Sequence, residues 1–112
     1  MYKPRRGGYI GTLRVSAPQA KRGDFVVVGL IKGFALFDAD PDGDTVLEIA
    51  GEFVTDVEAS GEDVVEGTPL YYNSETKMFT NSGTGAYHAV AGYGAKVATG
   101  SRAEVSVYLG LF

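Results

Sequence analysis

The sequence predicts an all-β protein, a small β-barrel or β-sandwich of one domain. Two observations support this class. Sixteen Gly and four Pro occur among 112 residues, which is more than an average globular chain contains. Val, Tyr and Phe recur in short apolar runs separated by these turn-forming residues, a pattern typical of strands joined by tight turns. No apolar run is long enough to span a membrane, so we expect no membrane partner.

Nine short strands are predicted, at residues 9–15, 25–31, 33–37, 45–50, 52–57, 69–72, 77–80, 88–97 and 103–109. The run Phe25–Ile31 is apolar throughout, which favours one strand buried on both faces. The acidic segment Asp38–Asp44 contains Pro and Gly and predicts a turn. Gly51 predicts a bend between two strands, and Asn73–Thr76 predicts a hairpin connection.

One short helix is predicted after these first strands. Ser60 and Asp63 have the spacing of a capping box, with Ser60 as the N-cap, and Gly67 provides a stop. The available length is about one and a half turns, so this helix must pack on the sheet to be stable.

The charges divide the chain into two parts. Residues 1–22 contain six basic side chains and no acid, whereas residues 23–112 contain four basic and all fourteen acidic side chains. We therefore predict a basic N-terminal arm with a first edge strand at 1–22 and a β-barrel body at 23–112. Charge segregated in this way indicates that the arm binds a partner, which could be a protein, a nucleic acid or a membrane.

A faint internal repeat is visible within the predicted body. Residues 22–27 resemble residues 66–71, and Gly33–Leu36 resembles Gly92–Ala95. Each block then passes through a Gly-containing turn to a final strand. Matches at glycine alone are weak evidence, so the sequence leaves open whether the fold consists of two related halves.

The same segments resemble the capsid decoration (cement) proteins of tailed phages. The resemblance covers about residues 23–110. It is carried by residues 23–28, Gly33–Leu36, 46–53, 64–72, Ala91–Ala95 and 105–109. It implies a β-tulip-like barrel that forms a homotrimer on the outer capsid surface of the virion and clamps neighbouring major capsid protein subunits without enzymatic activity. The arm is longer and more basic than the family pattern, so the resemblance says least about the role of the arm.

Three interpretations of the arm compete. A protein-docking arm would use Arg for carboxylates and Tyr or Ile for apolar pockets or strand pairing. A nucleic-acid-binding arm is the alternative function, that of a free-standing β-module, but the acidic body would repel the phosphates. An inert tail is the third. We favour docking on the capsid and expect no nucleic-acid partner, with the candidate capsid-binding residues Tyr2, Lys3, Arg5, Arg6, Tyr9 and Ile10.

Aromatic residues on or near the predicted strands form a second candidate site. Tyr is favoured at interfaces because its body is apolar while its hydroxyl can still find a hydrogen-bond partner. Ordinary strand composition is the competing explanation. The candidate subunit-interface residues are Tyr71, Tyr72, Tyr93, Tyr108 and Phe112.

No residue pattern indicates catalysis, a metal or a cofactor. The acidic turn begins like an EF-hand loop, but Ile49 stands where the bidentate Glu is required. His88 is the only His, and no nucleophile can be placed beside it from sequence. Asp24 ends an Arg-Gly-Asp tripeptide that we interpret as a turn, and Gly92-Tyr93-Gly94 lacks the rest of a phosphate-binding loop. The absence of Cys excludes disulfides.

Overall fold

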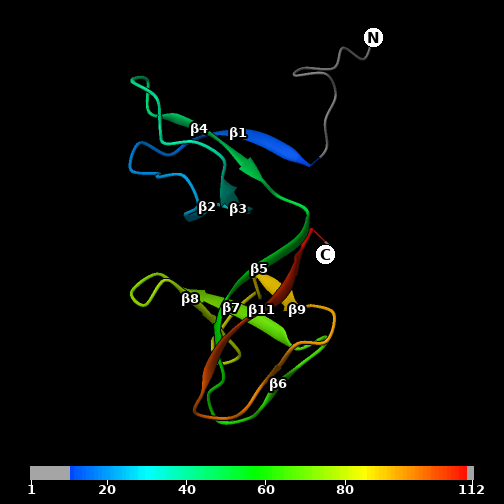
Figure 1. Ribbon diagram of the computed structural model, residues 1–112. Coiled ribbons are helices and arrows are strands. Elements are labelled where there is room, and N and C mark those ends of the chain that lie inside the picture. Colours follow the sequence, from blue (N-terminus) through cyan, green and yellow to red (C-terminus); the bar gives the residue numbers. More distant parts are fainter. Residues whose placement is uncertain (1–10, 111–112) are drawn as a thin grey trace. The chain divides into compact units, whose positions relative to one another are not determined.

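The computed structural model describes residues 11–110, and within them the chain forms strands and no helix (Figure 1). The predicted all-β class is confirmed. The contacts divide the chain into two compact units, unit 1 (residues 1–50) and unit 2 (residues 51–112). The boundary that we expected between residues 22 and 23 lies inside unit 1, because the strand before it pairs with one after it. No helix of the described residues is long and apolar enough to cross a membrane.

The strands alternate with short turns along both units. Their bounds are β1 (Thr12–Ser16), β2 (Phe25–Val28), β3 (Ile31–Ala35), β4 (Asp44–Glu48), β5 (Gly51–Glu58), β6 (Val64–Val65), β7 (Pro69–Asn73), β8 (Met78–Thr80), β9 (Ala89–Ala91), β10 (Lys96–Val97) and β11 (Arg102–Leu109).

Unit 1 is a four-stranded antiparallel sheet in the order β1-β4-β3-β2. Its core consists of Val15, Leu47 and two buried alanines, Ala20 and Ala35. Val26 and other partly buried apolar side chains pack against this cluster. Small residues therefore provide much of the core, and Leu47 is its only fully buried large side chain among residues 11–50.

The predicted strand Phe25–Ile31 is wrong, because this run forms a hairpin. Strands β2 and β3 pair from Phe25 with Phe34 to Val28 with Ile31, across the two-residue turn Gly29-Leu30. Gly29 has a φ of 61°, which Gly adopts without the steric cost that other residues incur. Leu30 at the tip is 96% exposed. An apolar run that was expected to be buried on both faces therefore leaves part of its surface open.

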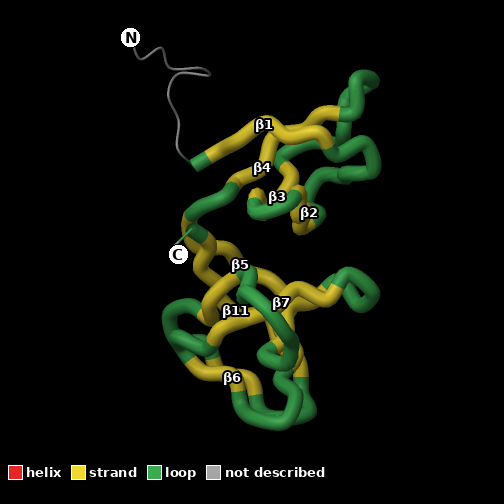
Figure 2. Tube along the Cα trace, turned by 180° about the vertical axis from the view of Figure 1, so that it is seen from behind, coloured by secondary structure: helices red, strands yellow, loops and turns green. Residues whose placement is uncertain are grey.

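Unit 2 contains five strands in the order β11-β5-β8-β7-β9, and β9 pairs again with β11, so that the ladder closes (Figure 2). The longest pairing joins β5 to β11, from Gly51 opposite Leu109 to Glu58 opposite Arg102. Strand β8 is parallel to β5 and antiparallel to β7. A separate two-stranded ladder joins β6 to β10. Among the described residues of this unit, the fully buried large side chains are Phe79, Leu70, Leu109, Val57, Val64 and Val107.

The predicted helix at Ser60–Asp63 is wrong, because both of the expected capping residues bond to distant parts of unit 2. The Ser60 N–H donates to Asn81 Oδ1 at 2.8 Å. The Asp63 carboxylate accepts from the Thr99 N–H at 2.8 Å and from Thr99 Oγ1 at 2.7 Å. These long-range bonds hold the segment in an irregular turn that leads into β6.

The predicted hairpin after this turn is confirmed. Strands β7 and β8 pair across residues 74–77, with Asn73 opposite Met78. Asn73 Oδ1 accepts hydrogen bonds from the N–H groups of Glu75 and Thr76, as turn-forming Asn side chains commonly do. Lys77 completes the turn with a positive φ of 59°.

The two units repeat one backbone pattern. Strands β1, β2, β3 and β4 correspond to β5, β7, β9 and β11, which have the same order and the same antiparallel pairing. In the pairing of β1 with β4, Arg14 lies opposite Val46, and in the corresponding pairing of β5 with β11, Val54 lies opposite Ser106. Four backbone hydrogen bonds of unit 1 have counterparts in unit 2. The bond from Gly23 N to Ala35 O corresponds to that from Gly67 N to Ala91 O, and the bond from Ala35 N to Asp24 O corresponds to that from Ala91 N to Thr68 O. Likewise, Asp24 N to Lys21 O corresponds to Thr68 N to Val65 O, and Leu36 N to Val46 O corresponds to Gly92 N to Ser106 O.

This correspondence decides the open question of the internal repeat. The sequence match of residues 22–27 with 66–71 has the observed register, since Gly23 corresponds to Gly67. The match of Gly33 with Gly92 does not, because the hydrogen bonds place Ala35 with Ala91. The repeat is therefore one of backbone pairing more than of glycine positions.

Candidate functional site

The candidate arm residues lie outside the described part of the chain. Tyr2, Lys3, Arg5, Arg6, Tyr9 and Ile10 all precede residue 11, and Phe112 follows residue 110. Their roles in docking and in subunit contact stay predictions.

The four remaining candidate tyrosines do not form one patch. Tyr71 and Tyr72 are neighbours on β7, so their side chains leave opposite faces of the strand. The half-buried Tyr72 ring packs edge-on against Phe79, with centroids 5.3 Å apart, so part of its surface is already covered within unit 2. Tyr93 is 77% exposed in the turn after β9, and half-buried Tyr108 lies on β11 opposite Val90. Tyr93 has the most surface available for a partner.

Exposed apolar side chains identify surface that the sequence analysis missed. Five of the eight exposed large apolar residues within 11–110 belong to unit 1, namely Leu13, Val27, Leu30, Ile31 and Phe37. Three of these five lie in or beside the hairpin of β2 and β3. Gly29, in the middle of the apolar run, was the available sequence signal, because a Gly there permits a tight turn. Exposed apolar surface that gathers in one region commonly marks an interaction site.

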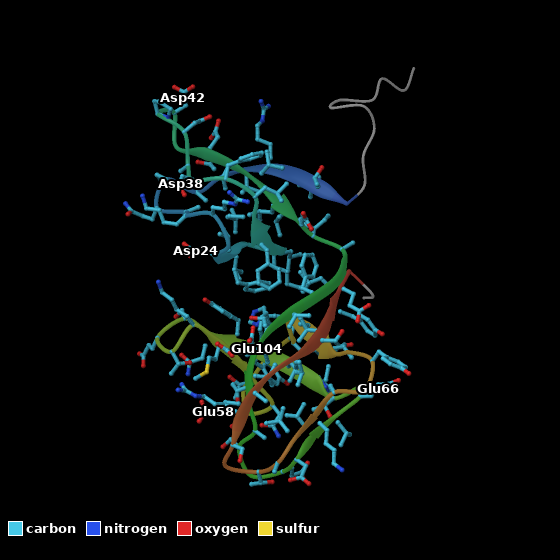
Figure 3. All side chains as sticks on the ribbon, in the orientation of Figure 1. Asp24, Asp38, Asp42, Glu58, Glu66 and Glu104 are labelled. Carbon is cyan, nitrogen blue, oxygen red and sulfur yellow. The ribbon has the colours of Figure 1, made fainter. Side chains whose placement is uncertain are left out.

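Acidic side chains are distributed over both units (Figure 3). Asp24, Asp38 and Asp42 belong to unit 1, and other labelled acids, such as Glu58 and Glu104, belong to unit 2. Net negative charge on residues 23–112 favours basic partners and disfavours nucleic acid.

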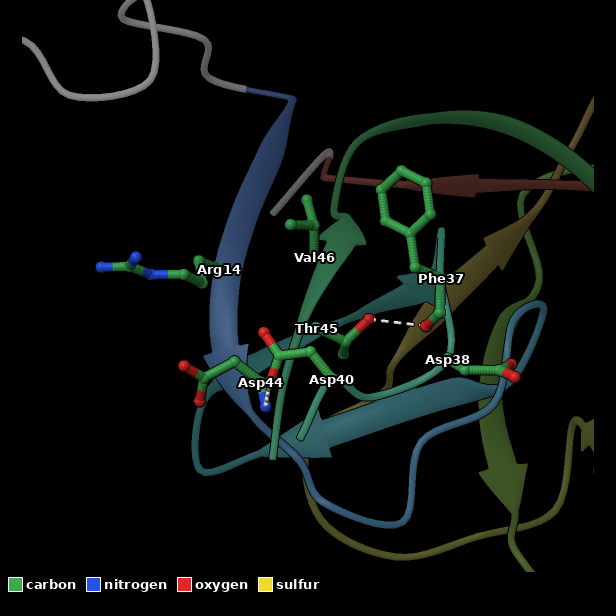
Figure 4. Close-up of a pocket in the computed structure, with 7 residues that line it drawn as sticks. All are labelled: Arg14, Phe37, Asp38, Asp40, Asp44, Thr45 and Val46. Atoms are coloured by element: carbon green, nitrogen blue, oxygen red, sulfur yellow. Dashed lines mark hydrogen bonds between the residues drawn. The ribbon is translucent and has the colours of Figure 1, made fainter. Parts of the chain in front are cut away.

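A groove of about 310 Å³ lies in unit 1 beside β4 (Figure 4). It is lined by Arg14, Phe37, Asp38, Asp40, Asp44, Thr45 and Val46. Thr45 Oγ1 donates to the Phe37 carbonyl oxygen at 2.7 Å, which fixes the chain beneath the 61% exposed Phe37 ring. The Arg14 side chain extends away from the three carboxylates in Figure 4. The groove therefore combines one apolar ring with a negative rim.

The acidic turn uses its carboxylates to hold its own backbone. Asp40 Oδ1 accepts from the N–H groups of Asp42 at 2.9 Å and Asp44 at 3.0 Å. Asp38 Oδ1 accepts from the Arg22 N–H at 2.9 Å. Within residues 11–110, no three His, Cys, Asp or Glu side chains are grouped as metal ligands would be. This geometry is that of a turn in which carboxylates replace the missing backbone acceptors.

Asp63 has a pKa that its hydrogen bonds hold below the usual value. The hydrogen bond from the Thr99 hydroxyl and then that from the Thr99 N–H lower the pKa of Asp63, desolvation partly opposes them, and the Lys96 charge adds a smaller lowering effect. A lowered pKa in the folded state contributes stability above the unfolded-state value of 3.8, and this contribution is lost as pH falls through the folded value.

Asp63→Asn should therefore lower the free energy of unfolding at pH 7 and have less effect at pH 3. Asn retains an acceptor for Thr99 but not the charge, so the difference between variant and wild type reports the charged hydrogen bonds. Urea unfolding at both pH values measures it. Glu75→Gln, on an exposed turn, serves as the control. An equal effect of Asp63→Asn at pH 7 and pH 3 would contradict the assignment.

Comparison with known proteins gives one match that covers most of the chain. A family model described as phage cement protein matches residues 6–109. Neither a curated protein nor a solved structure matches the chain.

Proposed function

The chain belongs to the phage cement protein family, and from this we infer that it binds the outer surface of a phage capsid as a homotrimer and bridges major capsid protein subunits. The family match over residues 6–109 is the observation that carries the proposal. Family membership supports a structural role on a phage capsid. The trimer, the outer surface and the bridging are the further steps that we propose.

One feature of the described residues supports a passive, adhesive role on a capsid. The apolar side chains Val27, Leu30 and Phe37 are exposed in unit 1 and can be buried against a protein lattice. A weak contact suffices if three copies of it act together, because linked sites gain avidity of roughly 10²–10⁴. The mechanism that we propose is burial of apolar surface, reinforced by the basic arm.

The proposal is tested on undecorated shells of the matching phage. We expect the protein to bind them at a fixed ratio to the major capsid protein and to raise the temperature at which the shells disrupt. Its mass in solution should be about three times 11.8 kDa. A monomer that leaves shells unchanged, or that shifts DNA or RNA on a gel, would favour the alternative of a nucleic-acid-binding module.

Neutralising the arm should weaken shell binding while leaving the trimer folded. The variant Lys3→Gln/Arg5→Gln/Arg6→Gln removes three positive charges. A solvent-accessible ion pair contributes up to about 1 kcal/mol, so we expect roughly tenfold weaker binding. The loss should shrink at high salt, since exposed charges are screened beyond roughly 10 Å at about 0.1 M. Sedimentation of labelled protein with shells at two salt concentrations measures both effects.

A charge-matched variant in unit 2 provides the control. Lys77→Gln/Lys96→Gln/Arg102→Gln removes the same number of positive charges from the body. We expect this control to bind like wild type or slightly less tightly. Equal losses for the two triple variants would show that net charge matters and that the arm has no special role.

A further inference from the structure

The repeated backbone pattern differs between the units in one strand. In unit 2, residues 74–88 between β7 and β9 contain β8, which pairs with β7. In unit 1, the corresponding strands β2 and β3 are joined by Gly29-Leu30 alone. Strand β2 therefore ends its sheet, whereas its counterpart β7 has a neighbour on both sides.

The backbone of β2 directs hydrogen-bonding groups to this outer edge. The Ala35 N–H donates to the Asp24 carbonyl, so the carbonyl group of Asp24 points toward the β3 side. The N–H and C=O groups of successive residues in an antiparallel strand point to alternate sides. The N–H and C=O groups of Val26 and Val28 therefore point toward β3, and those of Val27 point away from it, toward the outer edge. Within residues 11–110, no strand pairs with this edge of β2. In unit 2 the matching residue, Tyr71, faces Thr80 of β8.

The side chains beside this edge are less covered than their counterparts. Val26 is partly buried, whereas Leu70 at the same position of unit 2 is fully buried. Val28 corresponds to Tyr72, which contacts the fully buried Phe79 of β8. Val27 remains 46% exposed on the other face. An added strand with a large apolar residue at its centre would cover Val26 and Val28 as β8 covers unit 2.

A strand placed in unit 1 as β8 is placed in unit 2 could pair its backbone with the β2 edge but not with residues 17 and 18. In unit 2, β8 also pairs with β5 at Val57 and Glu58. The residues of unit 1 that correspond to Val57 and Glu58 are Ala17 and Pro18. This follows because Ala17 pairs with Gly43, through the bond from its N–H to the Gly43 carbonyl, at the place where Val57 pairs with Ala103 in unit 2. Pro18 has no N–H, and the Ala17 carbonyl already accepts from Ala20.

We propose that the outer edge of β2 accepts an extended strand of the major capsid protein, antiparallel to β2, with an apolar residue against Val26 and Val28. This proposal rests on the proposed function and names the contact surface. Main-chain pairing would give affinity, and the apolar residue would give specificity. An exposed strand edge beside exposed apolar side chains favours such pairing.

Two other occupants fit less well. The arm of the same or another copy contains Pro4, Gly7 and Gly8, which are unfavourable in strands. Antiparallel pairing of β2 with β2 of a second copy would bring only Val26 and Val28 of that copy to this face, since Phe25 and Val27 lie on the other face. Neither valine provides the large central side chain that Phe79 provides in unit 2. The experiments below distinguish these occupants.

Val27→Pro tests the edge directly, and Val27→Thr is its matched control. Proline removes the outward N–H and leaves the pairing with β3 intact, since Val27 does not donate to β3. Threonine keeps the N–H and the branched shape. Without the Val27 N–H, a carbonyl of the added strand would be buried without a hydrogen-bond donor. Such a loss weakens binding roughly 5- to 100-fold, which is the effect that we expect for Val27→Pro on undecorated shells. Val27→Thr should bind within about twofold of wild type. Equal binding of both variants and wild type would overturn the proposal.

Hydrogen exchange of the unmodified protein provides a test that does not depend on the folding of a variant. The Val27 amide should exchange rapidly in the free trimer and become protected on shells. Protection already present in the free trimer would show that a second copy or its arm covers the edge, and would overturn the proposal. Unprotected Val27 on bound shells would also overturn it. If the wild-type protein fails to bind shells at all, the proposed function itself fails, which is a distinguishable outcome.

Discussion

Phe79→Ala should lower the free energy of unfolding by about 3–5 kcal/mol, the range for removing a large aromatic side chain from a core. Phe79 is fully buried at the centre of β8 and its ring meets Tyr72 edge-on. Strand β8 links β5 to β7, so the cavity would lie where the ladder of unit 2 closes. Urea unfolding of wild type and variant, followed by circular dichroism, measures the loss.

Phe37→Ala is the matched control for this prediction. It removes the same ring from a position that is 61% exposed in unit 1, so we expect a loss of at most about 1 kcal/mol. A Phe79→Ala variant as stable as the Phe37→Ala variant would show that unit 2 does not depend on its central aromatic residue.

Gly33→Ala should destabilise unit 1 by about 3 kcal/mol. A Cβ at Gly33 would collide with the carbonyl oxygen of Glu48 and lie 2.9 Å from its carbonyl carbon. These are backbone atoms of the last residue of β4, and they cannot move aside as a flexible side chain can. Overpacking of this kind costs typically 1–3 kcal/mol or more. Hydrogen exchange of β3 and β4 amides, which reports unit 1 separately, measures the effect.

Gly11→Ala is the corresponding control. No atom lies within 4 Å of a Cβ built at Gly11, so the added methyl group has space. We expect a change within about 0.5 kcal/mol. If Gly33→Ala and Gly11→Ala have the same effect, the close approach of Gly33 to Glu48 does not limit the sequence at this position.

Local patterns predicted those parts of the fold that local forces determine. The hairpin of β7 and β8 could be predicted because Asn73 organises the turn with its own side chain. The helix at Ser60–Asp63 was wrong because Asp63 bonds to Thr99, a residue that is distant in sequence. A capping box shows which bonds are available locally, but it contains no information about a stronger partner elsewhere.

Periodicity failed at Phe25–Ile31 for a different reason. A continuous apolar run is consistent with one buried strand, and a two-residue turn within it changes only the direction of the chain. Gly29 was the only sign of that turn, and glycine also occurs inside strands. The consequence was functional, because Val27 and Leu30 were expected to be buried and are exposed.

The candidate site could be predicted at the level of the family but not of the contact surface. The resemblance found in the sequence agrees with the family match over residues 6–109. Composition indicated tyrosines as candidate interface residues without distinguishing Tyr72, which packs on Phe79, from the exposed Tyr93. The difference between a paired β7 and an unpaired β2 edge depends on long-range register, which residue types alone do not specify.

The connection between the units is very short. Strand β4 ends at Glu48 and β5 begins at Gly51, and the Ile49 N–H already donates to the Gly11 carbonyl. Two residues reach at most about 7 Å. Ile49 and Ala50 therefore leave almost no slack between the end of β4 and the start of β5, so this link is no flexible spacer of the kind that joins loosely tethered domains.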